Sequence, residues 1–284
     1  MNPTADATAA PTAVPTAAPT AVPTADATAD RLAQAFLTPR RGAGGTPPIV
    51  LPQSRRRRWP TSQGAVAAVD AGAGPIALLV HGWEGAAADL QPIAQRLLAE
   101  GLRVVAIDLP AHGESDGLQT SIPASARALL ALQRQLGSLA LVVAHSVGAA
   151  VAVEAMALGL DVQRAVLLAA PAHYLDYARG FARQAGLDAR QTEALVEALQ
   201  RLGVDVRDVS MPARARLLRQ PALFVHAEDD RIVPIADAVE SSTAWPGATL
   251  RRVAGLGHRR LLADPAVLDA VAAFARPVAE AATA

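Results

Sequence analysis

The sequence of 284 residues contains no cysteine, which excludes a disulfide scaffold, a cysteine nucleophile and a thiolate metal site. Aromatic residues make up only 3% of the chain, so alanine, valine and leucine must do most of the core packing. Neither sign of charge is in excess, because 26 Lys and Arg balance 26 Asp and Glu, and the composition therefore indicates no nucleic-acid partner. With 51% hydrophobic residues, the chain can bury a sizeable core in one large catalytic domain or two small ones.

Long apolar runs are also missing. The most membrane-like stretch, residues 139–160, contains His145, Ser146 and Glu154 and is interrupted at Gly148, so a buried strand, a turn and a helix explain it better than a membrane span. The first residues show neither the early basic residues nor the continuous apolar run of a signal peptide. We therefore expect a cytoplasmic protein that does not act at a membrane.

The N-terminal region is of low complexity. Residues 1–30 repeat short Pro-Thr-Ala units, which block regular structure and have little to bury, and we expect a disordered tail that can be removed at Arg31 without loss. Residues 31–284 then form the folded domain. A short helix is predicted at Arg31–Phe36, and the four arginines Arg55–Arg58 are expected to lie on a solvated strand edge or loop.

Short apolar runs alternate with amphipathic segments over most of the remaining chain. Six runs predict buried strands: Ile76–Val80, Val104–Ile107, Leu139–Val143, Ala165–Ala169, Ala222–Val225 and Thr249–Val253. Five helical patterns separate them: Leu90–Glu100, Ala124–Gln135, Val147–Leu158, Ile235–Ser242 and Asp264–Phe274. This alternation predicts an α/β fold, with a mainly parallel sheet covered by helices on both faces.

One long interval has helical patterns but no strand. Residues 173–220 contain predicted helices at Tyr174–Gln184, Ala189–Leu202 and Met211–Leu218. An insertion of this length between two strands is expected to lie over the sheet as a short helical cap.

The segment Ala144–Ala150 has the pattern of a nucleophile elbow. A buried strand leads into Ala144-His145-Ser146-Val147-Gly148 and then into an alanine-rich helix, so the turn would raise the Ser146 hydroxyl above the end of the sheet. Small residues are needed beside the serine because strand and helix come close there. The Val147 N–H would begin the helix, where its donor is free and the helix dipole is positive, and is a candidate oxyanion donor.

Two further loops carry the candidate partners of this serine. Glu228, Asp229 and Asp230 end a predicted strand, and of these Asp230 is our choice of acid because it directly precedes Arg-Ile-Val-Pro, with Asp229 as the alternative. His258 lies between a glycine turn and a helix after the last strand. A histidine with a pKa near neutrality can take the serine proton, and a carboxylate can fix its tautomer.

The motifs HGWEG, DLPAHGES, AHSVGA, EDDRIVP and GLGHRRLL together resemble the α/β-hydrolase superfamily, and most closely its small bacterial esterase-like serine hydrolases. The resemblance extends from about Phe36 to Phe274. It implies the order Ser146, Asp230, His258 for the catalytic residues and Trp83 as the second oxyanion N–H donor. Ala144 departs from the family pattern, which usually has glycine there.

The predicted reaction is hydrolysis of a small or medium carboxylic ester through an acyl-enzyme, with a small molecule as the only predicted partner and with no cofactor or metal. Trp83, Tyr174, Tyr177 and Phe181 are candidates for an apolar substrate pocket. A thioester, a lactone or a carbon–carbon bond stays open as the bond cleaved. A non-catalytic binding protein of the same fold is the alternative from another class. The oligomeric state is left open.

Overall fold

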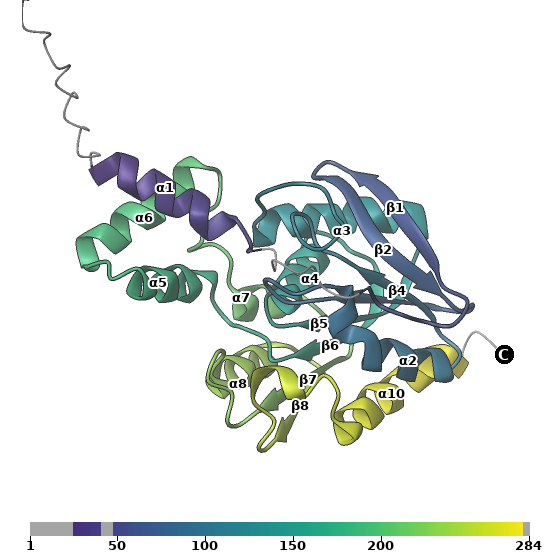
Figure 1. Cartoon of the computed structure of the whole chain (residues 1–284). Coiled ribbons are helices and arrows are strands. Elements are labelled where there is room, and N and C mark those ends of the chain that lie inside the picture. Colours follow the sequence, from purple (N-terminus) through teal and green to yellow (C-terminus); the bar gives the residue numbers. More distant parts are fainter. Residues whose placement is uncertain (1–24, 41–47, 281–284) are drawn as a thin grey trace, which may run out of the picture.

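The computed structural model describes residues 25–40 and 48–280, and within them the strands form one eight-stranded sheet in the order β1-β2-β4-β3-β5-β6-β7-β8 (Figure 1). The β1–β2 and β2–β4 pairs are antiparallel, and the remaining pairs are parallel. The strands are β1 Arg55–Thr61, β2 Gly64–Ala71, β3 Ile76–Val80, β4 Arg103–Ile107, β5 Leu139–His145, β6 Val162–Leu168, β7 Ala222–Ala227 and β8 Ala248–Val253.

The six predicted strands are confirmed as β3 to β8. Every residue of β3, β5 and β7 is buried, as expected for central parallel strands covered on both faces. The two antiparallel strands β1 and β2 lack such a run, because β1 is an exposed edge rich in arginine and β2 is rich in alanine. The four arginines lie on that solvated edge, where Arg56 pairs with Glu114 at 2.6 Å.

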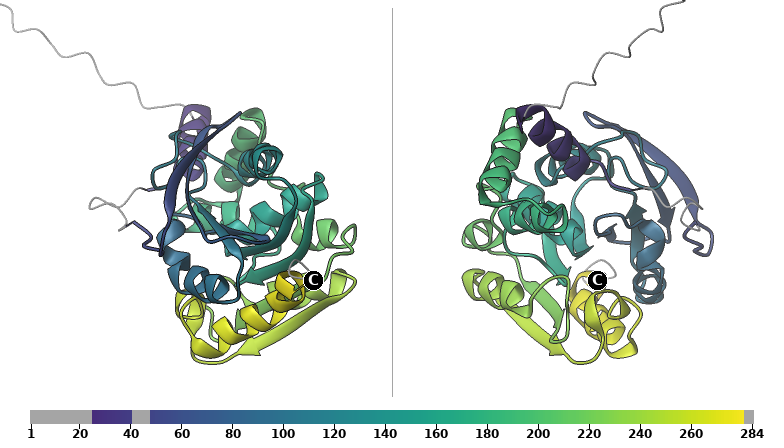
Figure 2. Two further views of the ribbon diagram at one scale, coloured as in Figure 1. Left: turned by 90° about the vertical axis from the view of Figure 1, so that its right-hand side faces the viewer. Right: turned by 60° about the vertical axis from the view of Figure 1, so that its left-hand side comes forward.

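Helices cover both faces of the sheet (Figure 2). One face carries α3 Ile122–Leu136, α4 Val147–Ala157 and α8 Ile235–Ala244, and the other carries α2 Gln91–Ala99 and α10 Pro265–Glu280. The remaining short helices of the domain are η1 Ala87–Leu90 and α9 Gly257–Arg260. In the described part of the chain, no helix has the length and apolar character needed to cross a membrane.

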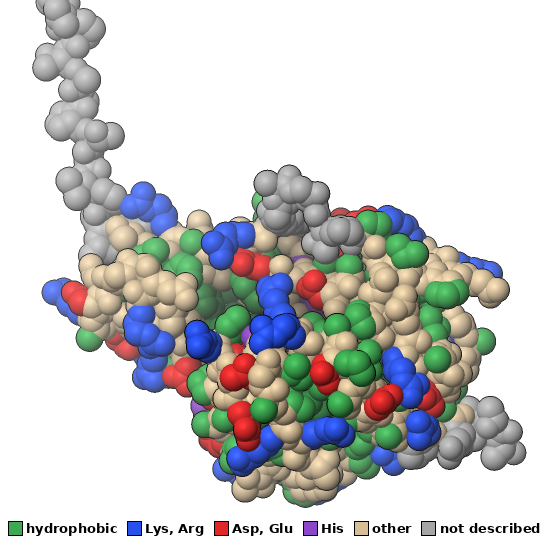
Figure 3. All heavy atoms as spheres, turned by 60° about the horizontal axis from the view of Figure 1, so that its bottom comes forward, with side chains coloured by type: hydrophobic (Ala, Val, Ile, Leu, Met, Phe, Trp, Pro, Cys, Tyr) green, Lys and Arg blue, Asp and Glu red, His purple; other side chains and the backbone are tan. Residues whose placement is uncertain are grey.

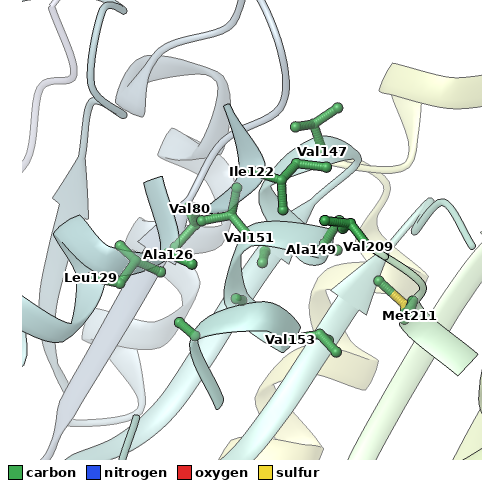
Figure 4. Packing of buried hydrophobic residues seen from close by; sticks show 14 of the residues in the cluster. Val80, Ile122, Ala126, Leu129, Val147, Ala149, Val151, Val153, Val209 and Met211 are labelled. Atoms are coloured by element: carbon green, nitrogen blue, oxygen red, sulfur yellow. The ribbon is translucent and has the colours of Figure 1, made fainter. Parts of the chain in front are cut away.

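Helix α4 is the most deeply packed helix of the sheet. Its residues Val147–Met156 are all buried, and Figure 4 shows Val147, Ala149, Val151 and Val153 among the side chains of this core. Buried apolar side chains on several sides fix the helix firmly against β5. The turn between β5 and α4 is therefore a rigid place from which to present a side chain.

The interval between β6 and β7 holds α5 Tyr174–Gln184, α6 Ala189–Arg201 and α7 Met211–Ala215. A helix from the other end of the chain, α1 Ala25–Leu37, packs against α6 (Figure 1). Ala29, Ala33 and Leu37 form its buried stripe, with the spacing of one helix face. The cap is therefore built from two segments that lie far apart in the sequence.

The structure corrects one predicted boundary. Residues 25–30 belong to α1 and are not a disordered tail, because burial of Ala29 and the 2.7 Å ion pair between Asp30 and Arg201 place this turn on the cap. The short helix predicted at Arg31–Phe36 is the second half of the same element. Residues 1–24 lie outside the described residues, so the tail prediction stays a prediction there.

Candidate active site

Ser146 occupies a sharp turn between β5 and α4. Its backbone has φ 53° and ψ −127°, a conformation that is rare for a residue with a side chain and that stores strain. The turn is held by the Ser146 N–H, which donates to the Leu168 carbonyl at 2.8 Å, and by the Ser146 carbonyl, which accepts from the Ala149 N–H at 2.9 Å. The surrounding structure thus imposes an unfavourable backbone in order to raise this hydroxyl from the sheet.

Close packing explains the small residue two positions later. A Cβ placed on Gly148 would lie 2.2 Å from the His81 carbonyl oxygen and 2.7 Å from that of Val80. The start of α4 therefore presses against the end of β3. Ala144, where the family pattern usually has glycine, is a fully buried strand residue whose methyl group is part of the core.

Ser146, His258 and Asp230 form one continuous hydrogen-bonded chain. His258 Nδ1 lies 2.7 Å from Asp230 Oδ2, and His258 Nε2 lies 3.0 Å from Ser146 Oγ. With the carboxylate accepting at Nδ1, the ring proton is at Nδ1, and Nε2 is free to accept the serine proton. The side chains are well covered, with 5% of Ser146, 8% of the His258 side chain and none of the Asp230 side chain exposed.

The electrostatics of Asp230 keep it ionised. Burial pushes its pKa upward, but hydrogen bonds from His258 and from the N–H groups of Val233 and Ile232 outweigh burial, so the pKa is lower than usual. The two N–H groups donate to Oδ1 at 3.0 and 2.8 Å, which leaves Oδ2 for the imidazole. His226, fully buried on the same strand end, donates from Nε2 to the Val233 carbonyl at 2.9 Å and so braces this turn.

Asp229, the alternative acid, has a different partner. Its Oδ1 accepts from the Gly257 N–H at 3.1 Å, while its Oδ2 lies 3.9 Å from Arg260. It therefore braces the loop that carries His258, and it is Asp230 that accepts the hydrogen bond from the imidazole. Glu228 is exposed, and its backbone N–H continues the pairing with β8 by donating to Val253.

His145, directly before the serine, is a site residue that our sequence reasoning did not select. Its Nε2 donates to the backbone carbonyl of His258 at 2.9 Å, and the two rings lie 4.8 Å apart. Burial, with the neighbouring His258 as the second cause, lowers the pKa of His145 to about 3, so it stays neutral. The position of His145 directly before Ser146 was the sequence signal that could have identified it.

Val147 and Trp83 carry the two backbone N–H groups that the sequence predicts as oxyanion donors. Among the described residues, no acceptor is hydrogen-bonded to the N–H of Val147 or to that of Trp83. The Trp83 loop follows β3, and a Cβ on Gly82 would lie 3.0 Å from Ser146 Cβ, so this loop runs directly beside the serine. His81 holds the loop: its Nε2 accepts from Leu109 N–H at 2.9 Å, and burial lowers its pKa to about 4. His81 therefore braces this loop against the loop after β4.

A sequence model of the alpha/beta hydrolase family matches residues 77–271, the part of the chain that carries Ser146, Asp230 and His258. The chain belongs to the alpha/beta hydrolase family. No curated protein is similar enough in sequence to match it.

Solved structures show the same hydrolase fold. The Pyrococcus furiosus esterase Pf2001 has a TM-score of 0.67 at 21% identity, over 85% of this chain and 99% of that one. A thermophilic esterase from Thermogutta terrifontis has a TM-score of 0.63 at 20% identity, over 79% and 99%. An esterase from Exiguobacterium antarcticum has a TM-score of 0.58 at 17% identity, over 81% and 100%. The chain thus spans nearly the whole length of each.

The four predicted pocket residues have different environments in this hydrolase. Tyr174 is buried, with its ring 5.5 Å from that of Phe36 and its hydroxyl at the Ile122 backbone. With Tyr177 it lines a small pocket between α4, α5 and α7, and its contact with substrate stays a prediction. Phe181 packs edge-on against Phe36 at 5.5 Å. Tyr177 lies near enough to Ser146 for the serine side chain to hold the pKa of the phenol below the value that burial alone would give. For Phe181 and Trp83, a contact with substrate stays a prediction.

Acidic and basic side chains are intermixed over the face shown in Figure 3. Within residues 25–40 and 48–280, no group of three or more His, Asp or Glu side chains is placed to hold a metal ion.

Proposed function

We propose that this hydrolase is a serine esterase that cleaves a small or medium carboxylic ester through a Ser146 acyl-enzyme. The observation that carries the proposal is the chain of two hydrogen bonds, 3.0 Å from Ser146 to His258 and 2.7 Å from His258 to Asp230. A nucleophile, a base in the correct tautomer and an ionised acid that holds the base are the parts that acyl transfer needs.

The reaction then follows from the geometry. Ser146 Oγ attacks the ester carbonyl carbon while its proton passes to His258 Nε2. The N–H groups of Val147 and Trp83 stabilise the oxyanion, each with about 3 kcal/mol. As the tetrahedral intermediate collapses, the bond to the leaving-group oxygen breaks and His258 returns the proton to that oxygen. His258 Nε2 then takes a proton from water while the water oxygen attacks the acyl carbon. As the bond from that carbon to Ser146 Oγ breaks, His258 returns the proton to Oγ and the carboxylic acid leaves.

The cover over the serine supports a compact substrate. Only 5% of Ser146 is exposed, and the cap helix α5 brings the buried Tyr177 hydroxyl to it. A narrow approach favours short and medium acyl chains over long lipids. The three solved structures of similar fold described above are esterases. At 17 to 21% identity, this likeness shows the fold alone.

A series of p-nitrophenyl esters from acetate to palmitate tests the proposal. We expect hydrolysis to be fastest for the shorter acyl chains and to fall by several orders of magnitude in Ser146→Ala. Labelling by a fluorophosphonate should occur in the wild type and be lost in the variant. A binding protein without catalysis would show neither labelling nor turnover, and a thioesterase, lactonase or carbon–carbon hydrolase would be labelled but prefer its own substrate over every ester.

A further inference from the structure

Tyr177 carries a buried hydroxyl that the reaction above leaves unused. It lies in α5, where its ring packs against the core and its Oη is inaccessible to solvent. Among the described residues, no group is within hydrogen-bonding geometry of this oxygen. Burial raises the pKa of Tyr177, so the hydroxyl keeps its proton as a donor. An unsatisfied buried hydroxyl costs free energy, which a bound ligand can recover.

The unpaired hydroxyl faces the catalytic serine. The Ser146 side chain lies near enough to the phenol to offset part of the rise in the pKa of Tyr177, without forming a hydrogen bond of good geometry. Asp237 and Asp230 are the charged groups near enough to act on the phenol. A substrate oxygen held at Ser146 Oγ would therefore come close to a donor that has no partner in the described part of the chain.

The sheet order places this donor on the side of the leaving group. Ser146 follows β5, whose neighbours are β3 on one side and β6 on the other. The Trp83 loop follows β3, whereas the helix with Tyr177 follows β6, and Asp230 and His258 follow β7 and β8 on that same side. An ester held with its carbonyl oxygen toward Trp83 N–H thus has its leaving-group oxygen toward His258 and Tyr177.

We infer that Tyr177 is a further catalytic residue, whose hydroxyl donates a hydrogen bond to the leaving-group oxygen of the ester. The inference rests on the proposed esterase function. In the step, the bond between carbonyl carbon and leaving-group oxygen breaks, the electron pair stays on that oxygen, and His258 Nε2 supplies the proton. Tyr177 keeps its own proton and stabilises the charge that develops before the proton arrives.

This role makes the effect of removing the hydroxyl depend on the leaving group. A p-nitrophenolate departs easily and needs little help, whereas an ethoxide needs a donor. The test compares p-nitrophenyl, phenyl, trifluoroethyl and ethyl esters of one short acid in wild type, Tyr177→Phe and Tyr174→Phe. Tyr174 is the matched control because it lies one turn earlier in α5 and its hydroxyl meets the Ile122 backbone.

For Tyr177→Phe we expect kcat/KM to fall about 10- to 100-fold on the ethyl ester and less than about threefold on the p-nitrophenyl ester. Labelling by a fluorophosphonate, which loses fluoride, should stay near the wild-type rate, and Tyr174→Phe should show no dependence on the leaving group. If Tyr177→Phe loses the same share of kcat/KM on all four esters, or loses none on any, the inference is overturned. Turnover of these esters by the wild type would still support the esterase function in that case. A wild type that cleaves no ester and escapes labelling would overturn both.

Discussion

His145 Nε2 donates a hydrogen bond to the backbone carbonyl of His258, so the residue beside the serine holds the loop that carries the base. One strand end, that of β5, therefore positions both reacting groups. The strained turn after β5 presents Ser146 Oγ. His145, the last residue of β5, holds the backbone of His258 through the 2.9 Å hydrogen bond from Nε2 to the carbonyl oxygen. The distance between Ser146 Oγ and His258 Nε2 is therefore set partly by β5 itself, together with Asp229 and Asp230 on the turn after β7.

The neutral state of His145 predicts how stability depends on pH. Its pKa falls from 6.5 to about 3 on folding, so between these values the unfolded chain binds a proton that the folded chain does not. Stability is therefore lost as pH drops through this window, by up to roughly 1.4 kcal/mol per pH unit, and the contribution is flat above it. His145→Phe should unfold in urea with a shallower dependence on pH between 4.5 and 6.5. An unchanged slope would show that His145 does not stay neutral in the folded protein.

The three neighbouring carboxylates should differ sharply in their effect on turnover. Asp230→Asn removes the acceptor that fixes the His258 tautomer and should lower kcat by several orders of magnitude. Asp229→Asn loses the contact with Gly257 N–H, and Glu228→Gln changes an exposed side chain, so both should have much smaller effects. All three variants are compared on one short ester, with melting temperature as the check on folding. If Asp229→Asn, and not Asp230→Asn, loses most of its turnover, the acid that orients His258 is Asp229.

The close approach of α4 to β3 predicts an intolerance at Gly148. Gly148→Ala places a methyl carbon 2.2 Å from the His81 carbonyl oxygen and should cost about 2 kcal/mol or more in the free energy of unfolding. Gly180→Ala in α5 is the control, because its Cβ would meet nothing closer than Arg183 Nη2 at 3.7 Å. That control should be stabilised by about 0.5 kcal/mol, through helix propensity. Denaturant unfolding of both variants distinguishes them, and equal stabilities would contradict the crowding at Gly148.

The N-terminal helix α1 should stabilise the cap. A chain that starts at Thr38 loses the burial of Leu37, worth about 2 kcal/mol, and the ring contacts of Phe36 with Tyr174 and Phe181. Compared with a chain that starts at Ala25, it should melt at a lower temperature and lose activity, because α5 carries Tyr177. In Asp30→Ala only the half-exposed ion pair with Arg201 is lost, and the cost should be about 0.5 kcal/mol. Equal melting of the two truncated chains would show that α1 does not support the cap.

Local sequence patterns were enough to predict β3 to β8 and to locate the proposed nucleophile, but not β1 and β2. Continuous apolar runs such as Ile76–Val80 specify buried parallel strands, because only strands covered on both faces are apolar throughout. The string Ala144-His145-Ser146-Val147-Gly148 specifies the elbow, since small residues must stand where strand and helix meet. Both signals are local, so a window of a few residues contains all the information.

The tertiary structure alone decided which distant groups meet. Asp230 and Asp229 are alike in sequence, yet the turn after β7 directs one to an imidazole 28 residues away and the other to the Gly257 N–H. Tyr174 and Tyr177 are equally plausible pocket residues and lie one turn apart in α5, yet the hydroxyl of Tyr174 meets the Ile122 backbone whereas that of Tyr177 lies near Ser146. Contacts of this kind depend on how loops and helices pack across the sheet, and no local pattern encodes that packing.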